Sequence, residues 1–140
     1  MAYKLLRAVF RYRWMASFCL VLLLDVGTYM ALSKTEGQAL FDNQDKLLHV
    51  LAFFGFYILG HFSLNLDFFP GIKKFSYTIT LMNWIMWSAY GAFIELAQKY
   101  FTSRHGSLND FIADLVGISL GTVFVSVFKL YPRAGDPKTQ

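Results

Sequence analysis

The stretch LLHVLAFFGFYILGHFSLNL, residues 47–66, decides the fold of this chain. It contains no Asp, Glu, Lys or Arg, and it matches the roughly 20 apolar residues that a helix needs to cross a ~30 Å hydrocarbon core. Because lipid offers the backbone no hydrogen-bond partners, such a stretch is expected to be a transmembrane helix.

Three further apolar segments flank this stretch, at about 14–32, 75–100 and 111–130. Helices joined by short connections pack as antiparallel neighbours. The sequence therefore predicts one all-α domain over residues 1–140. We expect a polytopic membrane protein with a four-helix transmembrane bundle and a short polar tail at 132–140.

The composition excludes other classes of protein. The chain has 140 residues, of which 56% are hydrophobic and 16% charged, whereas globular chains average about 25% charged residues. Disordered chains lack this many apolar residues. One cysteine excludes a disulfide framework and a multi-cysteine metal site. A net charge of +4 on so apolar a chain indicates membrane lipids as partners rather than nucleic acid, and no cofactor is expected.

The basic residues predict the orientation. Nine of them lie on one side of the expected bundle: Lys4, Arg7, Arg11, Arg13, Lys73, Lys74, Lys129, Arg133 and Lys138. Four lie on the other side: Lys34, Lys46, Lys99 and Arg104. The positive-inside rule then places both termini in the cytoplasm. A cleaved signal peptide is the alternative for the first segment, although its apolar stretch is longer than a signal core.

Most unusual polar residues fall in the outer half of this bundle. The candidate site consists of Asp45, Lys46, His49, Glu95, Gln98, Arg104, Ser107, Asp110 and Asp114. Three pairs among them have helical spacing and share a helix face: Asp45 with His49, Glu95 with Gln98, and Asp110 with Asp114. Ionisable groups inside a membrane are costly and mark functional sites by default.

Structural interpretations compete with this one. Ser107 with Asp110 fits a helix-capping box, and Asp45 could cap the second helix. Arg104 could lie at the lipid head groups or neutralise Glu95.

Other polar and small residues have simpler interpretations. We expect His61 to be a packing histidine, Asp25 to bind a neighbouring helix, and Gly117 with Gly121 to mark a close helix contact. Trp84 and Trp87, with many of the other aromatic residues, are expected to face lipid or the interface.

Metal binding is not favoured by the sequence. Asp45, His49, Glu95, Asp110 and Asp114 would suit a divalent ion, but no tight ligand motif is present and Arg104 would repel a cation. The sequence therefore predicts no metal site.

Four motifs in order resemble the VanZ-like family of small bacterial membrane proteins. They are Asp45-Lys46-Leu-Leu-His49, Gly91-x-x-x-Glu95-x-x-Gln98, Arg104-x-x-Ser107-x-x-Asp110, and Gly117 with Gly121. The resemblance implies a helical bundle linked to low-level resistance to the glycopeptide antibiotic teicoplanin. Asp114 departs from the pattern, because the family commonly has Asn there, and no Pro precedes Arg104.

Three functions remain open at this point. The first is an outward-facing site for an anionic lipid-linked or cell-envelope ligand, such as an envelope precursor or a glycopeptide, with Arg104 and Lys46 binding its charge. The second is a membrane hydrolase or transferase, which is less favoured because no nucleophile is evident. The third is a structural bundle that docks an unknown protein partner.

Overall fold

The chain is all-helical throughout the part that the structure describes. This computed structural model describes residues 14–33, 41–69, 76–102, 106–128 and 130. The helices are α2 (Met15–Leu32), α3 (Gln44–Phe62), η1 (Ser63–Phe68), α4 (Tyr77–Phe101) and α5 (Leu108–Val127). Because η1 is a π-helical segment that directly continues α3, the two form one rod from Gln44 to Phe68.

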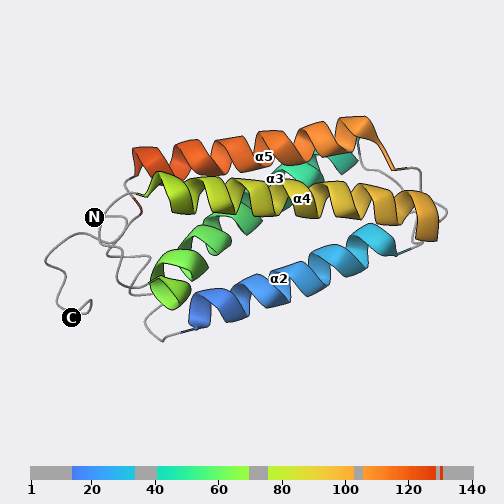
Figure 1. The fold of residues 1–140 in the computed structure, drawn as a ribbon. Helices are drawn as coiled ribbons and strands as arrows, with labels where there is room; N and C mark the ends of the chain where they lie inside the picture. Colours follow the sequence, from blue (N-terminus) through green and yellow to red (C-terminus); the bar gives the residue numbers. More distant parts are fainter. Residues whose placement is uncertain (1–13, 34–40, 70–75, 103–105, 129, 131–140) are drawn as a thin grey trace, which may run out of the picture.

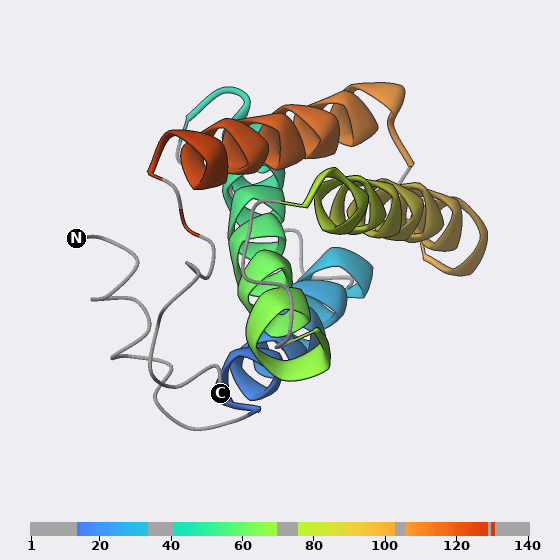
Figure 2. The same cartoon turned by 60° about the vertical axis from the view of Figure 1, so that its left-hand side comes forward.

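The four long helices run up and down as a bundle with α3 at its centre. Figure 1 shows consecutive helices in alternating directions, so that the end of α2 lies at the same end of the bundle as the beginning of α3. The helix α3 contacts α2, α4 and α5, and α4 contacts α2 and α5 (Figure 2). Among the described residues, α2 and α5 are the one pair of long helices that do not contact each other.

Small residues allow α3 and α5 to pack closely. A Cβ atom at Gly117 would overlap the carbonyl oxygen of Val50 and lie 3.0 Å from the backbone nitrogen of Phe54. A Cβ atom at Gly121 would lie 2.9 Å from the ring of Tyr57. The expected small-residue contact is therefore confirmed, and it brings α5 against the backbone of α3.

Three helices are long and apolar enough to cross a membrane. They are Met15–Leu32, Gln44–Phe68 and Leu108–Val127. Length and apolar composition of this kind indicate a membrane protein. The expected all-helical architecture is confirmed at this level.

The helix bounds differ from the sequence expectations at several ends. The second helix begins three residues earlier than expected, at Gln44, so Asp45 lies within its first turn. Its N-cap residue Asn43 has φ 62° and makes no side-chain capping hydrogen bond. The last helix begins at Leu108 and ends at Val127, earlier than expected at both ends. The expected tail, 132–140, lies outside the described residues.

The core is aromatic at mid-height, which corrects one expectation. Trp87 is 2% exposed and stacks on Phe56 with ring centroids 5.2 Å apart. Its indole Nε1–H donates to Asn83 Oδ1 at 2.9 Å, and the Asn83 amide donates to the Tyr57 carbonyl oxygen at 3.0 Å. Trp87 is therefore a core residue and not a lipid-facing one, because Asn83 satisfies its polar N–H inside the bundle.

The end of the bundle at which α2 begins is more polar than the sequence suggested. Asp67 is buried and accepts hydrogen bonds from the backbone N–H groups of Trp14 and Ser17, at 2.9 and 3.1 Å. These N–H groups are free at the beginning of a helix, so Asp67 caps α2 from a distant segment of the chain. His61 is buried and bonds to the Leu130 carbonyl oxygen at 2.7 Å, which confirms its packing role.

Candidate functional site

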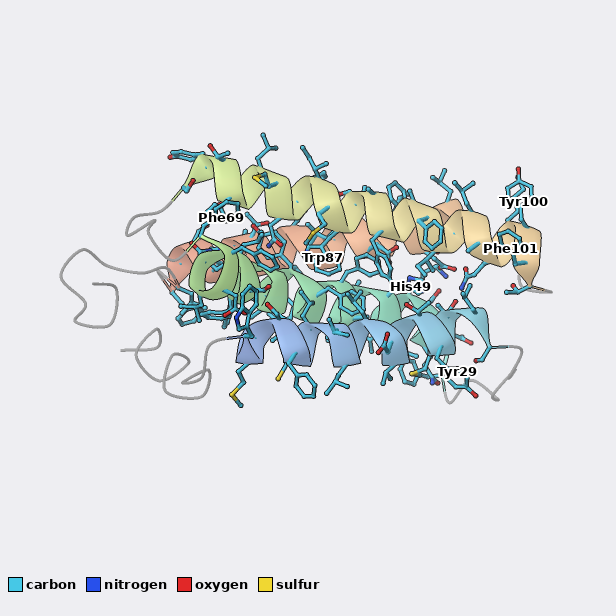
Figure 3. All side chains as sticks on the ribbon, turned by 60° about the horizontal axis from the view of Figure 1, so that its bottom comes forward. Tyr29, His49, Phe69, Trp87, Tyr100 and Phe101 are labelled. Carbon is cyan, nitrogen blue, oxygen red and sulfur yellow. The ribbon has the colours of Figure 1, made fainter. Side chains whose placement is uncertain are left out.

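The candidate site lies at one end of the bundle, between α3, α4 and α5. Figure 3 places His49 at the end that also carries Tyr29, Tyr100 and Phe101, whereas Phe69 lies at the opposite end. The end of α4 and the beginnings of α3 and α5 meet here because consecutive helices alternate in direction. The prediction that three helices present polar residues at one depth agrees with this arrangement.

His49 and Asp114 form the buried centre of the site. The two side chains are joined by a hydrogen bond of 2.7 Å between His49 Nδ1 and Asp114 Oδ1. The side chain of Asp114 is 0% exposed and that of His49 12%. Gly117 lies three residues after Asp114, so the close packing of α5 on α3 brings this carboxylate against the imidazole.

Glu95 reaches the same centre from α4. Its Oε2 accepts a hydrogen bond of 2.6 Å from the backbone N–H of Ser107. A Cβ atom at the neighbouring Gly106 would overlap the Glu95 carbonyl oxygen, so only a residue without a side chain fits here. The loop that leads into α5 is thereby fastened to the last turns of α4.

Gly91 makes room for the carboxylate of Asp114. A Cβ atom at Gly91 would lie 2.8 Å from Asp114 Oδ2. Gly91 and Glu95 are one turn apart on α4 and share a face. Because Gly91 has no side chain, the carboxylate of Asp114 can contact α4 one turn before Glu95.

The acidic residues and His49 form two overlapping groups. In the first, ligand-type atoms of His49, Glu95 and Asp114 all lie within 4.8 Å of one another. In the second, those of Asp45, His49 and Asp110 lie within 4.8 Å of one another. His49 belongs to both groups, and either group has donor atoms that could hold a metal ion.

The other expected site residues have structural partners. Lys46 Nζ donates to Asn43 Oδ1 at 3.0 Å, on the exposed side of the first turn of α3. The Gln98 amide donates to the Ala31 carbonyl oxygen at 3.0 Å, which ties α4 to the last turn of α2. Ser107 is the N-cap residue of α5, and its Oγ accepts from the Asn109 N–H at 3.2 Å. Arg104 lies outside the described residues.

A cavity of about 570 Å³ adjoins this cluster, between the second half of α2, the first half of α3 and α4. Its walls are mostly apolar, and its polar lining includes Asp45 and His49. The volume is in the range of sites that hold small amphiphilic molecules, about 300–1,000 Å³. The complete lining is Gly27, Tyr29, Met30, Ala31, Ser33, Gln44, Asp45, Leu48, His49, Ala52, Phe53, Phe56, Tyr90 and Ile94.

Sequence reasoning missed the part of the site that α2 contributes. The hydroxyl groups of Thr28 and Tyr90 are 2.6 Å apart and join α2 to α4 beside the cavity. Asp25 was expected to bind a neighbouring helix, but its side chain is exposed on α2 and has no hydrogen bond to another helix in the described part of the chain. Single Thr and Tyr residues in apolar helices carry no spacing signal, so the cavity could not be located from the sequence.

Comparison with known proteins found no matching family model, no matching curated protein and no matching solved structure.

Proposed function

We propose that this chain is a four-span protein of the bacterial cytoplasmic membrane that binds a lipid-linked ligand of the cell envelope. The cavity beside His49 and Asp45 carries the proposal, because its apolar walls suit a lipid chain and its polar rim suits a head group. Membrane lipids are thus the expected partners. The link to teicoplanin resistance and envelope maintenance depends on the VanZ-like resemblance and is part of the same proposal.

The exposed surface of α4 supports a fourth span. Its 25 residues reach about 37 Å at 1.5 Å per residue, which exceeds a ~30 Å hydrocarbon core. Asn83 and Gln98 are buried, and Glu95 is largely covered, so these polar groups lower the average hydropathy without facing lipid. The exposed side chains along the middle of α4 are apolar: Leu81, Met82, Ile85, Met86, Phe93 and Leu96.

The excess of basic residues on one side supports cytoplasmic termini. In that orientation the cluster around His49 and the cavity open towards the outer leaflet, where lipid-linked envelope intermediates are used. An anionic head group would then be bound by Arg104, since Lys46 is hydrogen-bonded to Asn43 and does not line the cavity.

A cavity-filling substitution tests the proposal. Ala52 lines the cavity, and Ala52→Phe should displace a bound lipid, whereas Leu51→Phe adds a ring on the exposed face of the same helix. Native mass spectrometry of detergent-purified protein, after addition of polyprenyl phosphate or zwitterionic phospholipid, should show lipid on the wild type and on L51F but not on A52F. Equal lipid retention by A52F and L51F would refute cavity binding. Loss of the phosphate preference in Arg104→Gln would identify the anion-binding residue.

The His49–Asp114 pair favours one alternative, a membrane hydrolase or transferase. A buried carboxylate that orients an imidazole beside a ligand cavity is the arrangement of a general base. Turnover of labelled lipid phosphates and esters by wild-type protein, lost in His49→Gln, would establish catalysis. Binding without turnover across such a panel would leave ligand binding as the function.

A further inference from the structure

Three helices bring a donor set of mixed chemistry to one point of the bundle. His49 comes from α3, Glu95 from α4 and Asp114 from α5, and one ligand-type atom of each lies within 4.8 Å of the other two. One imidazole nitrogen and two carboxylate oxygens are the donors of many zinc and manganese sites. No two of these residues are neighbours in the sequence, so only the fold assembles them.

Two buried oxygen atoms of this set have no hydrogen-bond partner among the described residues: Asp114 Oδ2 and Glu95 Oε1. The second oxygen of each carboxylate is occupied, on Asp114 by His49 and on Glu95 by the N–H of Ser107. Buried polar atoms are rarely left unsatisfied, and each one needs a physical explanation. Asp114 is fully buried, and its free oxygen lies in the space that Gly91 leaves open.

The charge of the cluster also favours a cation. Glu95 and Asp114 both lie within 4.8 Å of a single imidazole, that of His49. One protonated histidine would balance only one of these two carboxylates. Charges in or near a membrane core are expected to be paired or to coordinate a metal.

We propose that His49, Glu95 and Asp114 bind one divalent cation of the zinc or manganese class. On the side of the cavity that Asp45 and His49 line, the exposed Asp45 and the nearly buried Asp110 lie within 4.8 Å of the same imidazole. Ligand atoms at about 2.0–2.2 Å from a tetrahedral ion are about 3.3–3.6 Å apart, so side-chain rotation must bring together any donor atoms that are near the 4.8 Å limit. The inference does not depend on the proposed lipid binding, because Glu95 and Asp114 do not line the cavity and are tested by variants other than A52F.

Metal retention by the full-length protein tests this site. Protein purified in detergent is stripped with EDTA, given Zn²⁺, Mn²⁺ or Co²⁺, desalted and assayed for metal by mass spectrometry. The wild type should retain one ion per chain, and bound Co²⁺ should show d–d absorption bands. Asp114→Asn and Glu95→Gln each replace a proposed carboxylate ligand, so each should weaken binding by at least the roughly tenfold that the loss of a residue supporting a metal ligand costs.

Matched substitutions at the other end of the bundle serve as controls. Asp67→Asn removes a buried carboxylate, and His61→Gln removes a buried imidazole, but neither residue belongs to the cluster. Both should retain the metal as the wild type does. No retained ion in the wild type, or equal retention by D114N, E95Q and the controls, would overturn the proposal.

Thermal unfolding gives a second readout that a structural role alone would not produce. In EDTA, E95Q should unfold at the same temperature as the wild type or at a higher one, because it removes a carboxylate from an acidic cluster. Zn²⁺ should raise the unfolding temperature of the wild type but not that of E95Q. An E95Q protein that is destabilised in EDTA, together with a wild type that does not respond to Zn²⁺, would show a hydrogen-bonded carboxylate cluster instead of a metal site.

Discussion

Replacing Gly117 by alanine should separate α3 from α5 and destabilise the protein. The new Cβ atom would overlap the Val50 carbonyl oxygen and lie 3.0 Å from the Phe54 nitrogen. Both are helix backbone atoms and cannot rotate away, so the helices must move. Overpacking of this kind costs about 1–3 kcal/mol, whereas alanine gains up to about 1 kcal/mol over glycine in helix propensity. The free energy of unfolding should therefore fall by roughly 1–2 kcal/mol.

Gly55→Ala is the matched control, because Gly55 lies on α3 and, among the described residues, its Cβ atom would meet only Leu23 Cδ2, at 3.5 Å. That is an ordinary contact with a flexible side chain, so G55A should keep the gain of up to about 1 kcal/mol in helix propensity. Both variants can be unfolded with SDS in mixed micelles and followed by far-ultraviolet circular dichroism. If G117A were as stable as G55A, close backbone packing would not hold α3 to α5, and the account of the site's assembly would be wrong.

Three further substitutions test the polar contacts that fix the helices. Asp67→Asn should lower the free energy of unfolding by about 1–3 kcal/mol, because the carboxylate that caps the beginning of α2 is lost. Asp42 is exposed, so Asp42→Asn should leave the free energy of unfolding unchanged in the same SDS titration. Trp87→Phe should lower the free energy of unfolding by about 1–3 kcal/mol, because it leaves Asn83 Oδ1 buried without its donor. Trp84 donates no hydrogen bond to Asn83, so Trp84→Phe should cost less. Equal losses would contradict the role of the Asn83 contact. Gln98→Leu removes the hydrogen bond to the Ala31 carbonyl oxygen. Amide hydrogen exchange should therefore accelerate in the last turn of α2 and not in α5. Unchanged exchange in α2 would show that other contacts hold this turn.

The sequence predicts the number of helices, their α-helical type and the position of the polar cluster at one end of the bundle. It can do so because these features depend on local patterns. Apolar runs of membrane-spanning length predict the helices, and spacing of three or four residues predicts which polar side chains share a face. His49 and Asp114 could thus be assigned to one end of the bundle. Their direct contact could not be predicted, because it depends on the orientation of α5 about its own axis and on the distance between α5 and α3.

Polar residues outside the candidate site show the other limit. Asp67 and Asn83 have no spaced partner in the sequence, so nothing local distinguishes them from surface residues. Their roles arise from contacts with segments about 50 and 26 positions away, at Ser17 and Tyr57. Trp87 was misplaced for the same reason, because its N–H finds a partner only within the packed bundle.

The expected anion site and the observed acidic cluster can be reconciled in two ways, which differ in the source of positive charge. If Arg104 neutralises Glu95 and Asp114, Arg104→Gln should destabilise the protein and EDTA should have no effect. If a divalent cation neutralises them, R104Q should bind metal as well as the wild type does, and stripping the metal should destabilise both proteins. Only in the second case is Arg104 available for an anionic head group, so the metal-binding experiment also determines whether this residue can serve ligand recognition.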